Sequence, residues 1–152
     1  MIARVSGSMT DGVRNNRRDL LKGAAALAAT LDDAPGTTGL LIVSGGNEIR
    51  TGAHRGMAAL AARIAAAGYP VFRYDRRGIG DSTGDNTGFE GSGPDIAAAA
   101  THFRELQPQL IRMVAFGNCD AATALALFGA NAGLDAIVLA NPWSIDAPGE
   151  DG

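Results

Sequence analysis

Four short apolar runs recur along the chain, separated by segments whose apolar residues follow a helical period. The runs occupy residues 40–44, 70–74, 111–116 and 136–140. Apolar runs of this length, without polar alternation, are typical of strands buried on both faces of a parallel sheet. The helical period is found over residues 54–67, 95–106 and 121–131. Strands that alternate with helices of this length indicate βαβ units.

The pattern therefore predicts an α/β fold, with an open parallel sheet and helices on both of its faces, because crossovers between parallel strands are right-handed. We expect the strand at 70–74 to lie outside the strand at 40–44. The spatial order of the strands is then 70–74, 40–44, 111–116 and 136–140.

The first 35 residues differ from the rest of the chain. A polar stretch with Arg17 and Arg18 precedes an alanine-rich apolar run, and this arrangement resembles a twin-arginine export signal. An amphipathic helix or an edge strand is the alternative interpretation. We assign residues 1–35 to an N-terminal extension that is partly mobile, residues 36–143 to the core, and residues 144–152 to a loose tail. We expect a cytoplasmic protein, with export through Arg17-Arg18 as the alternative.

Composition narrows the function classes. The chain has 152 residues, of which 46% are hydrophobic, which fits one domain. The net charge of −3 argues against a strongly basic nucleic-acid binder. A single cysteine cannot form an internal disulfide, and no Cys/His spacing suits zinc. No apolar run approaches the roughly 20 residues that span a bilayer. Composition and spacing therefore argue against a metal, a nucleic-acid partner and a membrane span. We also expect a small-molecule substrate and no cofactor, and leave a homo-oligomer open.

The sharpest chemical signal lies where the third predicted strand gives way to a helix. Gly117, Cys119 and Ala121 form a G-x-C-x-A pattern, which corresponds to the G-x-S-x-G nucleophile elbow with Cys in place of Ser. In such an elbow the nucleophile lies on a strained turn, so the residues two before and two after it must be small. We predict a positive φ and at least partial exposure for Cys119. The alternative is a small buried hydrophobic residue, which is common for a lone cysteine.

A glycine-containing loop follows the first predicted strand. If the strands at 40–44 and 111–116 are neighbours, this loop faces Cys119, and the backbone N–H groups of Gly46, Asn47 and Asp120 could hold an oxyanion. An ordinary glycine turn is the alternative. Arg50 and His54 lie just beyond the loop. We interpret His54 as a helix cap or surface residue rather than a catalytic base.

Residues 75–84 form a polar loop rich in glycine and charge. Its Gly78-x-Gly80 pattern does not indicate a dinucleotide site, because no helix begins within the loop to receive a pyrophosphate. An EF-hand is also excluded, because its closing glutamate would stand at Ser92. We expect a solvated turn that is pinned by Asp75 and the neighbouring arginines.

The polar loop and the elbow together resemble the α/β-hydrolase superfamily. The segment from Asp75 to Ser82 looks like its D-x-R-G-x-G-x-S turn. The stretch 30–143 resembles more closely the type one branch of the exosortase A system-associated hydrolases. The matching pieces are residues 42–46, 50–55, 68–75, 117–122 and 141–143. The resemblance implies hydrolytic activity and a link to exopolysaccharide and protein-sorting loci.

The resemblance also has departures. Chains of that family continue well past the position of Trp143 with a lid, two more strands, a catalytic acid and a catalytic histidine. Here nine residues follow Trp143, and the only histidines are His54 and His102. We interpret the chain as an N-terminal part of a hydrolase that cleaves ester or thioester bonds through Cys119. The alternative is a catalytically incomplete, hydrolase-like fragment that serves as a binding or assembly module.

Overall fold

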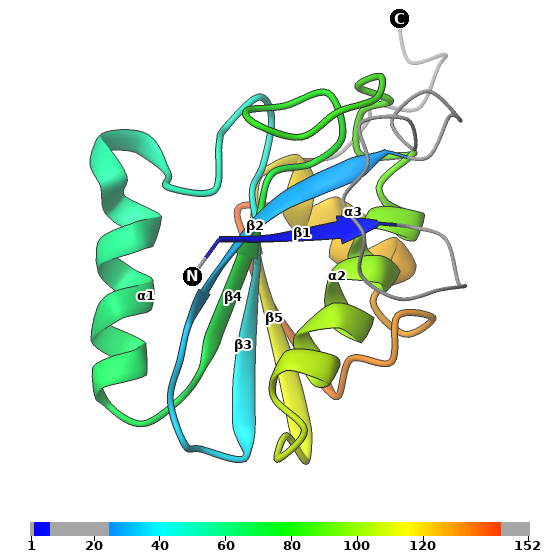
Figure 1. The fold of residues 1–152 in the computed structure, drawn as a ribbon. Coiled ribbons are helices and arrows are strands. Elements are labelled where there is room, and N and C mark those ends of the chain that lie inside the picture. Colours follow the sequence, from blue (N-terminus) through cyan, green and yellow to red (C-terminus); the bar gives the residue numbers. More distant parts are fainter. Residues whose placement is uncertain (1, 7–24, 144–152) are drawn as a thin grey trace, which may run out of the picture.

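A six-stranded mixed sheet organises the described part of the chain, which comprises residues 2–6 and 25–143 of the computed structural model (Figure 1). Its strands are β1 (Ile2–Ser6), β2 (Ala26–Asp32), β3 (Thr38–Val43), β4 (Val71–Tyr74), β5 (Arg112–Asn118) and β6 (Ala136–Ala140). Their spatial order is β1-β2-β4-β3-β5-β6. The strands β4, β3, β5 and β6 are parallel to one another, and the spatial order predicted for them is confirmed.

Two further strands lie in the segment that the sequence analysis assigned to an N-terminal extension. β2 pairs antiparallel with β4, and β1 pairs antiparallel with β2. Ala28, Ala29 and Leu31 of β2 are buried. The sheet therefore begins before residue 36, and the boundary predicted there is wrong. Alanine is depleted in strands, and here pairing and burial outweigh that tendency. Arg17, Arg18 and the tail 144–152 lie outside the described residues.

Helices cover both faces of the sheet, as predicted. They are α1 (Gly56–Ala66), α2 (Gly93–Leu106) and α3 (Asp120–Phe128), with a short 3-10 helix, η2 (Ala53–Arg55), before α1. Figure 1 shows α1 on one side of the sheet and α2 and α3 on the other. No helix of the described residues is long and apolar enough to cross a membrane.

The larger part of the core lies between the sheet and the helices α2 and α3. Phe72 of β4 stacks on Phe103 of α2, with the ring centroids 5.3 Å apart. Leu41, Met113 and Leu125 are fully buried in the same cluster. A smaller cluster under α1 contains Ile42, Ala61 and Val71. This packing fixes the carboxyl ends of β3, β4 and β5 relative to one another, and the candidate site lies at those ends.

Candidate active site

Cys119 occupies the turn between β5 and α3. It has φ 58° and ψ −129° and stands at the N-cap of α3, so the predicted positive φ is confirmed. Such a backbone conformation costs a non-glycine residue about 1–3 kcal/mol. The residue is half-buried, which agrees with the predicted partial exposure. The chain thus holds its only cysteine in a strained position at a strand–helix turn.

Close packing around this turn explains the small residues on either side of it. A Cβ atom at Gly117 would lie 2.8 Å from the backbone carbon and oxygen of Ala121. Ala121 itself is fully buried. A side chain at position 117 would push β5 and α3 apart, and the turn could not form.

Hydrogen bonds from the end of β6 hold the turn in place. The Cys119 N–H donates to the Ala140 carbonyl at 3.0 Å, and the Trp143 N–H donates to the Cys119 carbonyl at 3.3 Å. The Thr123 hydroxyl of α3 donates to the Trp143 carbonyl. The Trp143 ring meets Phe89 edge-on, with the ring centroids 5.7 Å apart. The backbone on both sides of Cys119 is therefore fixed by β6 and the residues that follow it.

The loop after β3 lies beside Cys119, as predicted from the strand order. Strands β3 and β5 pair in parallel, with Val43 opposite Gly117. A Cβ atom at Gly45 would collide with the backbone oxygen of Asn118, so the loop approaches the turn closely. Beyond it, the Gly46 N–H donates to Oδ1 of Asp120 at 2.6 Å. The Gly46 N–H, which we predicted as an oxyanion donor, is thus already engaged by a carboxylate of the chain itself.

Arg76 completes this contact from the end of β4. Its Nη2 donates to Oδ2 of Asp120 at 3.2 Å and also to the carbonyl of Gly46. The Arg76 side chain is 4% exposed. Asn47, the other predicted donor in the loop, accepts a hydrogen bond from the Asn86 amide through its side chain, at 3.3 Å. We call the three residues Gly46, Arg76 and Asp120 the loop–elbow bridge.

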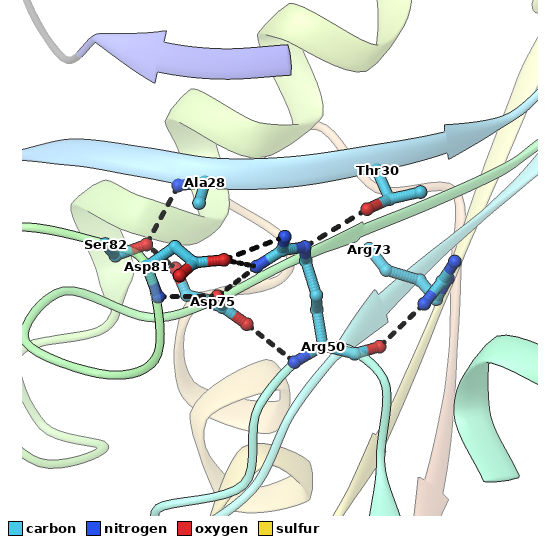
Figure 2. A network of polar contacts seen from close by, with 7 residues as sticks. All are labelled: Ala28, Thr30, Arg50, Arg73, Asp75, Asp81 and Ser82. Atoms are coloured by element: carbon cyan, nitrogen blue, oxygen red, sulfur yellow. Dashed lines mark hydrogen bonds and ion pairs between the residues drawn. The ribbon is translucent and has the colours of Figure 1, made fainter. Parts of the chain in front are cut away.

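A second polar network joins the loop after β3, which contains Arg50, to the loop after β4, which contains Asp75 and Asp81. Its centre is Asp75, which is fully buried (Figure 2). Asp75 accepts hydrogen bonds from the N–H groups of Arg50 and Asp81, at 2.6 and 3.0 Å, and pairs with the Arg50 guanidinium. The Ser82 hydroxyl donates to the Asp75 carbonyl at 2.6 Å and accepts from the N–H of Ala28 at 2.9 Å.

The Arg50 guanidinium is shared among several partners in Figure 2. It reaches Oδ2 of Asp81 at 3.1 Å and the Thr30 hydroxyl of β2 at 3.1 Å, while the Arg50 carbonyl accepts from Arg73 at 2.9 Å. The expected solvated turn at residues 75–84 is therefore corrected in one respect. Asp75 does pin the turn, but it is buried and binds an arginine from the preceding loop.

Neither histidine forms a catalytic pair with the cysteine in the described part of the chain. His54 lies in η2 with φ 51°, is exposed, and makes no hydrogen bond to the turn. His102 lies on α2, where it contacts Glu105 at 3.1 Å and the Phe72 ring. The interpretation of His54 as a surface residue rather than a base agrees with this placement.

Tyr74 is buried at the end of β4. Burial raises the pKa of Tyr74 far above its ordinary value, and the nearby Asp95 carboxylate raises it further, although Arg76 opposes the change. Asp95 itself pairs with Arg77, whose Nε lies 2.9 Å from it, and this hydrogen bond raises the pKa of Arg77. Tyr74 therefore stays protonated and is no candidate for a general base.

The topology and the elbow define the α/β-hydrolase fold, and comparison with solved structures gives the same result. The α/β-hydrolase GrgF from Penicillium sp. sh18 matches 99% of this chain at 20% identity, with a TM-score of 0.70. An α/β-hydrolase from Sphaerobacter thermophilus DSM 20745 matches 80% at 26% identity, with a TM-score of 0.58. The Pyrococcus furiosus esterase Pf2001 matches 74% at 18% identity, with a TM-score of 0.60.

The matches cover 48%, 44% and 49% of those three chains, so this chain spans about half of their length. No protein-family model and no curated protein matches it. The likeness to the solved structures therefore establishes the fold.

Proposed function

We propose that the protein is a hydrolase of ester or thioester bonds in small molecules, with Cys119 as its nucleophile. The observation that carries the proposal is the placement of the only cysteine at the strained β5–α3 turn, half-buried and beside the loop after β3. In the reaction the Cys119 Sγ attacks the carbonyl carbon, and the bond to the leaving alcohol or thiol breaks. Water then hydrolyses the resulting thioester.

Backbone N–H groups at the mouth of the turn would stabilise the oxyanion of this step. We assign that role to Asp120, at the start of α3, and to Gly46 and Asn47, in the loop after β3. Gly117 and Ala121 support the turn by being small. The proposal includes no cofactor and no metal, since the chemistry of a thiol nucleophile needs neither.

The sequence resemblance adds a biological setting. On its strength we propose that the hydrolase acts in exosortase or exopolysaccharide systems. We also propose that it stays in the cytoplasm. The alanine-rich run overlaps β2, whose Ala28 and Ala29 are buried in the sheet, so signal cleavage after that run would remove sheet strands.

We expect the 152-residue chain to hydrolyse p-nitrophenyl acetate weakly or not at all, because neither histidine activates the thiol. Any residual rate should rise with pH, as the attacking species is the thiolate, and should vanish in Cys119→Ala. His54→Ala serves as the control and should leave the rate unchanged. A residual rate that survives in Cys119→Ala would contradict the nucleophile assignment, and a rate abolished by His54→Ala would show that the base is misplaced.

A second candidate function is an assembly module, and the surface of β6 favours it. Ile137, Val138 and Leu139 are 40%, 50% and 39% exposed, and Leu127 of the adjacent α3 is 56% exposed. β6 is also the last strand of the sheet formed by the described residues. An apolar edge strand without charges is a template for pairing with another chain. We propose a second copy of this chain as the occupant.

The strand is self-complementary for such pairing. In a two-fold antiparallel arrangement centred on Val138, Ile137 meets Leu139 of the second copy, and Ala136 meets Ala140. We expect a dimer in sedimentation equilibrium and a monomer for Val138→Lys, because the strand pair would have to bury two like charges. Leu60→Lys on α1 is the control and should remain dimeric. A monomeric wild type, or dimeric Val138→Lys, would contradict the assembly proposal.

A further inference from the structure

The loop–elbow bridge places the Asp120 carboxylate on the Gly46 N–H, which the proposed reaction needs as a free hydrogen-bond donor. We propose that Asp120 is a built-in occupant of the oxyanion site, which the substrate carbonyl must displace before Cys119 can be acylated. This inference rests on the proposed function, since it concerns the same site. It assigns to Asp120 a second role: its backbone N–H serves the oxyanion, while its side chain competes with the oxyanion for Gly46.

The geometry of the contact supports competition. A carboxylate oxygen and an oxyanion are both negatively charged oxygens that accept hydrogen bonds from backbone N–H groups. The 2.6 Å between the Gly46 nitrogen and Oδ1 of Asp120 is short, as in a charge-assisted hydrogen bond. The single Gly46 proton cannot serve two acceptors at full strength. While the carboxylate stays in place, the loop after β3 contributes less to the stabilisation of an oxyanion.

Arg76 both holds the carboxylate and provides for its release. Its Nη2 bridges Asp120 and the Gly46 carbonyl, which keeps the three groups together. Its Nη1 is buried and has no hydrogen-bond partner within the described residues. A carboxylate that leaves the Gly46 N–H can therefore take a further charge-assisted hydrogen bond from Arg76. Displacement exchanges one hydrogen bond for another and leaves no buried charge unpaired.

A purely structural role for Asp120 makes the opposite prediction. If the carboxylate only fastens the loop to α3, its removal would let Gly46 drift from the turn, and the oxyanion site would become worse. If the carboxylate occupies the site, its removal frees the Gly46 N–H, and the site becomes better. The two roles are distinguished by whether removal of the Asp120 carboxylate improves or impairs the oxyanion site.

The experiment compares two reactions of the same thiol. Acetylation by p-nitrophenyl acetate forms the Sγ–C bond, breaks the ester C–O bond, releases p-nitrophenolate and passes the thiol proton to water. An oxyanion develops during this acetylation. Alkylation by iodoacetamide forms the Sγ–C bond and releases iodide without an oxyanion. The ratio of the two rate constants at Cys119, read from the modified peptide by mass spectrometry, reports the oxyanion site and cancels changes in thiolate content and access.

We expect Asp120→Ala to raise this ratio by about tenfold, a modest part of the 10²–10³ attributed to one oxyanion donor. Asp120→Asn keeps an oxygen acceptor for Gly46 but loses the charge, so its ratio should rise by a smaller factor. Asp120→Asn also carries the test if Asp120→Ala does not fold. A ratio that is unchanged or lower in the folded variant would overturn the occupant role. A thiol that is alkylated but never acetylated, in the wild type and both variants, would overturn the proposed function as well.

Discussion

Replacement of Asp75 by alanine should lower the free energy of unfolding by about 3–5 kcal/mol, the cost of breaking a buried ion pair by removing one partner. Asp75 is fully buried, pairs with the Arg50 guanidinium and accepts hydrogen bonds from two backbone N–H groups. Without it, Arg50 keeps its charge in a largely buried position and two N–H groups lose their acceptor. Urea denaturation measures the change.

Asp81→Asn is the matched control, because Asp81 binds the same arginine from the surface. Its side chain is 75% exposed, and an exposed ion pair contributes about 0–1 kcal/mol. We therefore expect this variant to lose less than about 1 kcal/mol. Equal losses in the two variants would contradict the view that Asp75 is the centre of the network in Figure 2.

Gly45→Ala should reduce the acetylation of Cys119 about 100-fold, within the range for the loss of an oxyanion donor. The added Cβ would collide with the backbone oxygen of Asn118 and lie 3.1 Å from Oδ1 of Asp120. The loop after β3 must then move away from the turn, at a cost of about 1–3 kcal/mol in stability. The acetylation rate and the midpoint of thermal unfolding measure the two effects.

Gly46→Ala separates steric collision from backbone strain at the neighbouring position. Gly46 has φ 54°, but no atom lies within 4 Å of an added Cβ. We expect it to lose about 1 kcal/mol through strain, and to keep more of the acetylation rate than Gly45→Ala. Equal acetylation in Gly45→Ala and the wild type would contradict the close approach of loop and turn.

Much of the fold could be predicted from the sequence, because β3 to β6 are continuous apolar runs separated by helical segments. β2 could not, since the run from Ala26 to Asp32 consists mainly of alanine and leucine and has no strong strand preference. Its pairing with β4 and its contacts with Ser82 and Arg50 depend on residues far away in the chain. Such partners leave no local signal.

The candidate site divides in the same way. The turn at Cys119 follows from local sterics, since Gly117 and Ala121 are the small residues that a strained strand–helix turn requires. The loop–elbow bridge does not, because Arg76 and Asp120 are 44 residues apart and neither of the patterns that contain them indicates that their side chains meet. An aspartate directly after the nucleophile position is the one local hint, and it does not say where its side chain points.

The central claim is that Cys119 is the nucleophile, and the acyl intermediate tests it most directly. Intact-mass spectrometry of the chain after brief exposure to p-nitrophenyl acetate should find one acetyl group, located on Cys119, removed by neutral hydroxylamine as a thioester is, and absent in Cys119→Ala. Acetyl groups that resist hydroxylamine and persist in Cys119→Ala, with none on Cys119 of the wild type, would contradict the account.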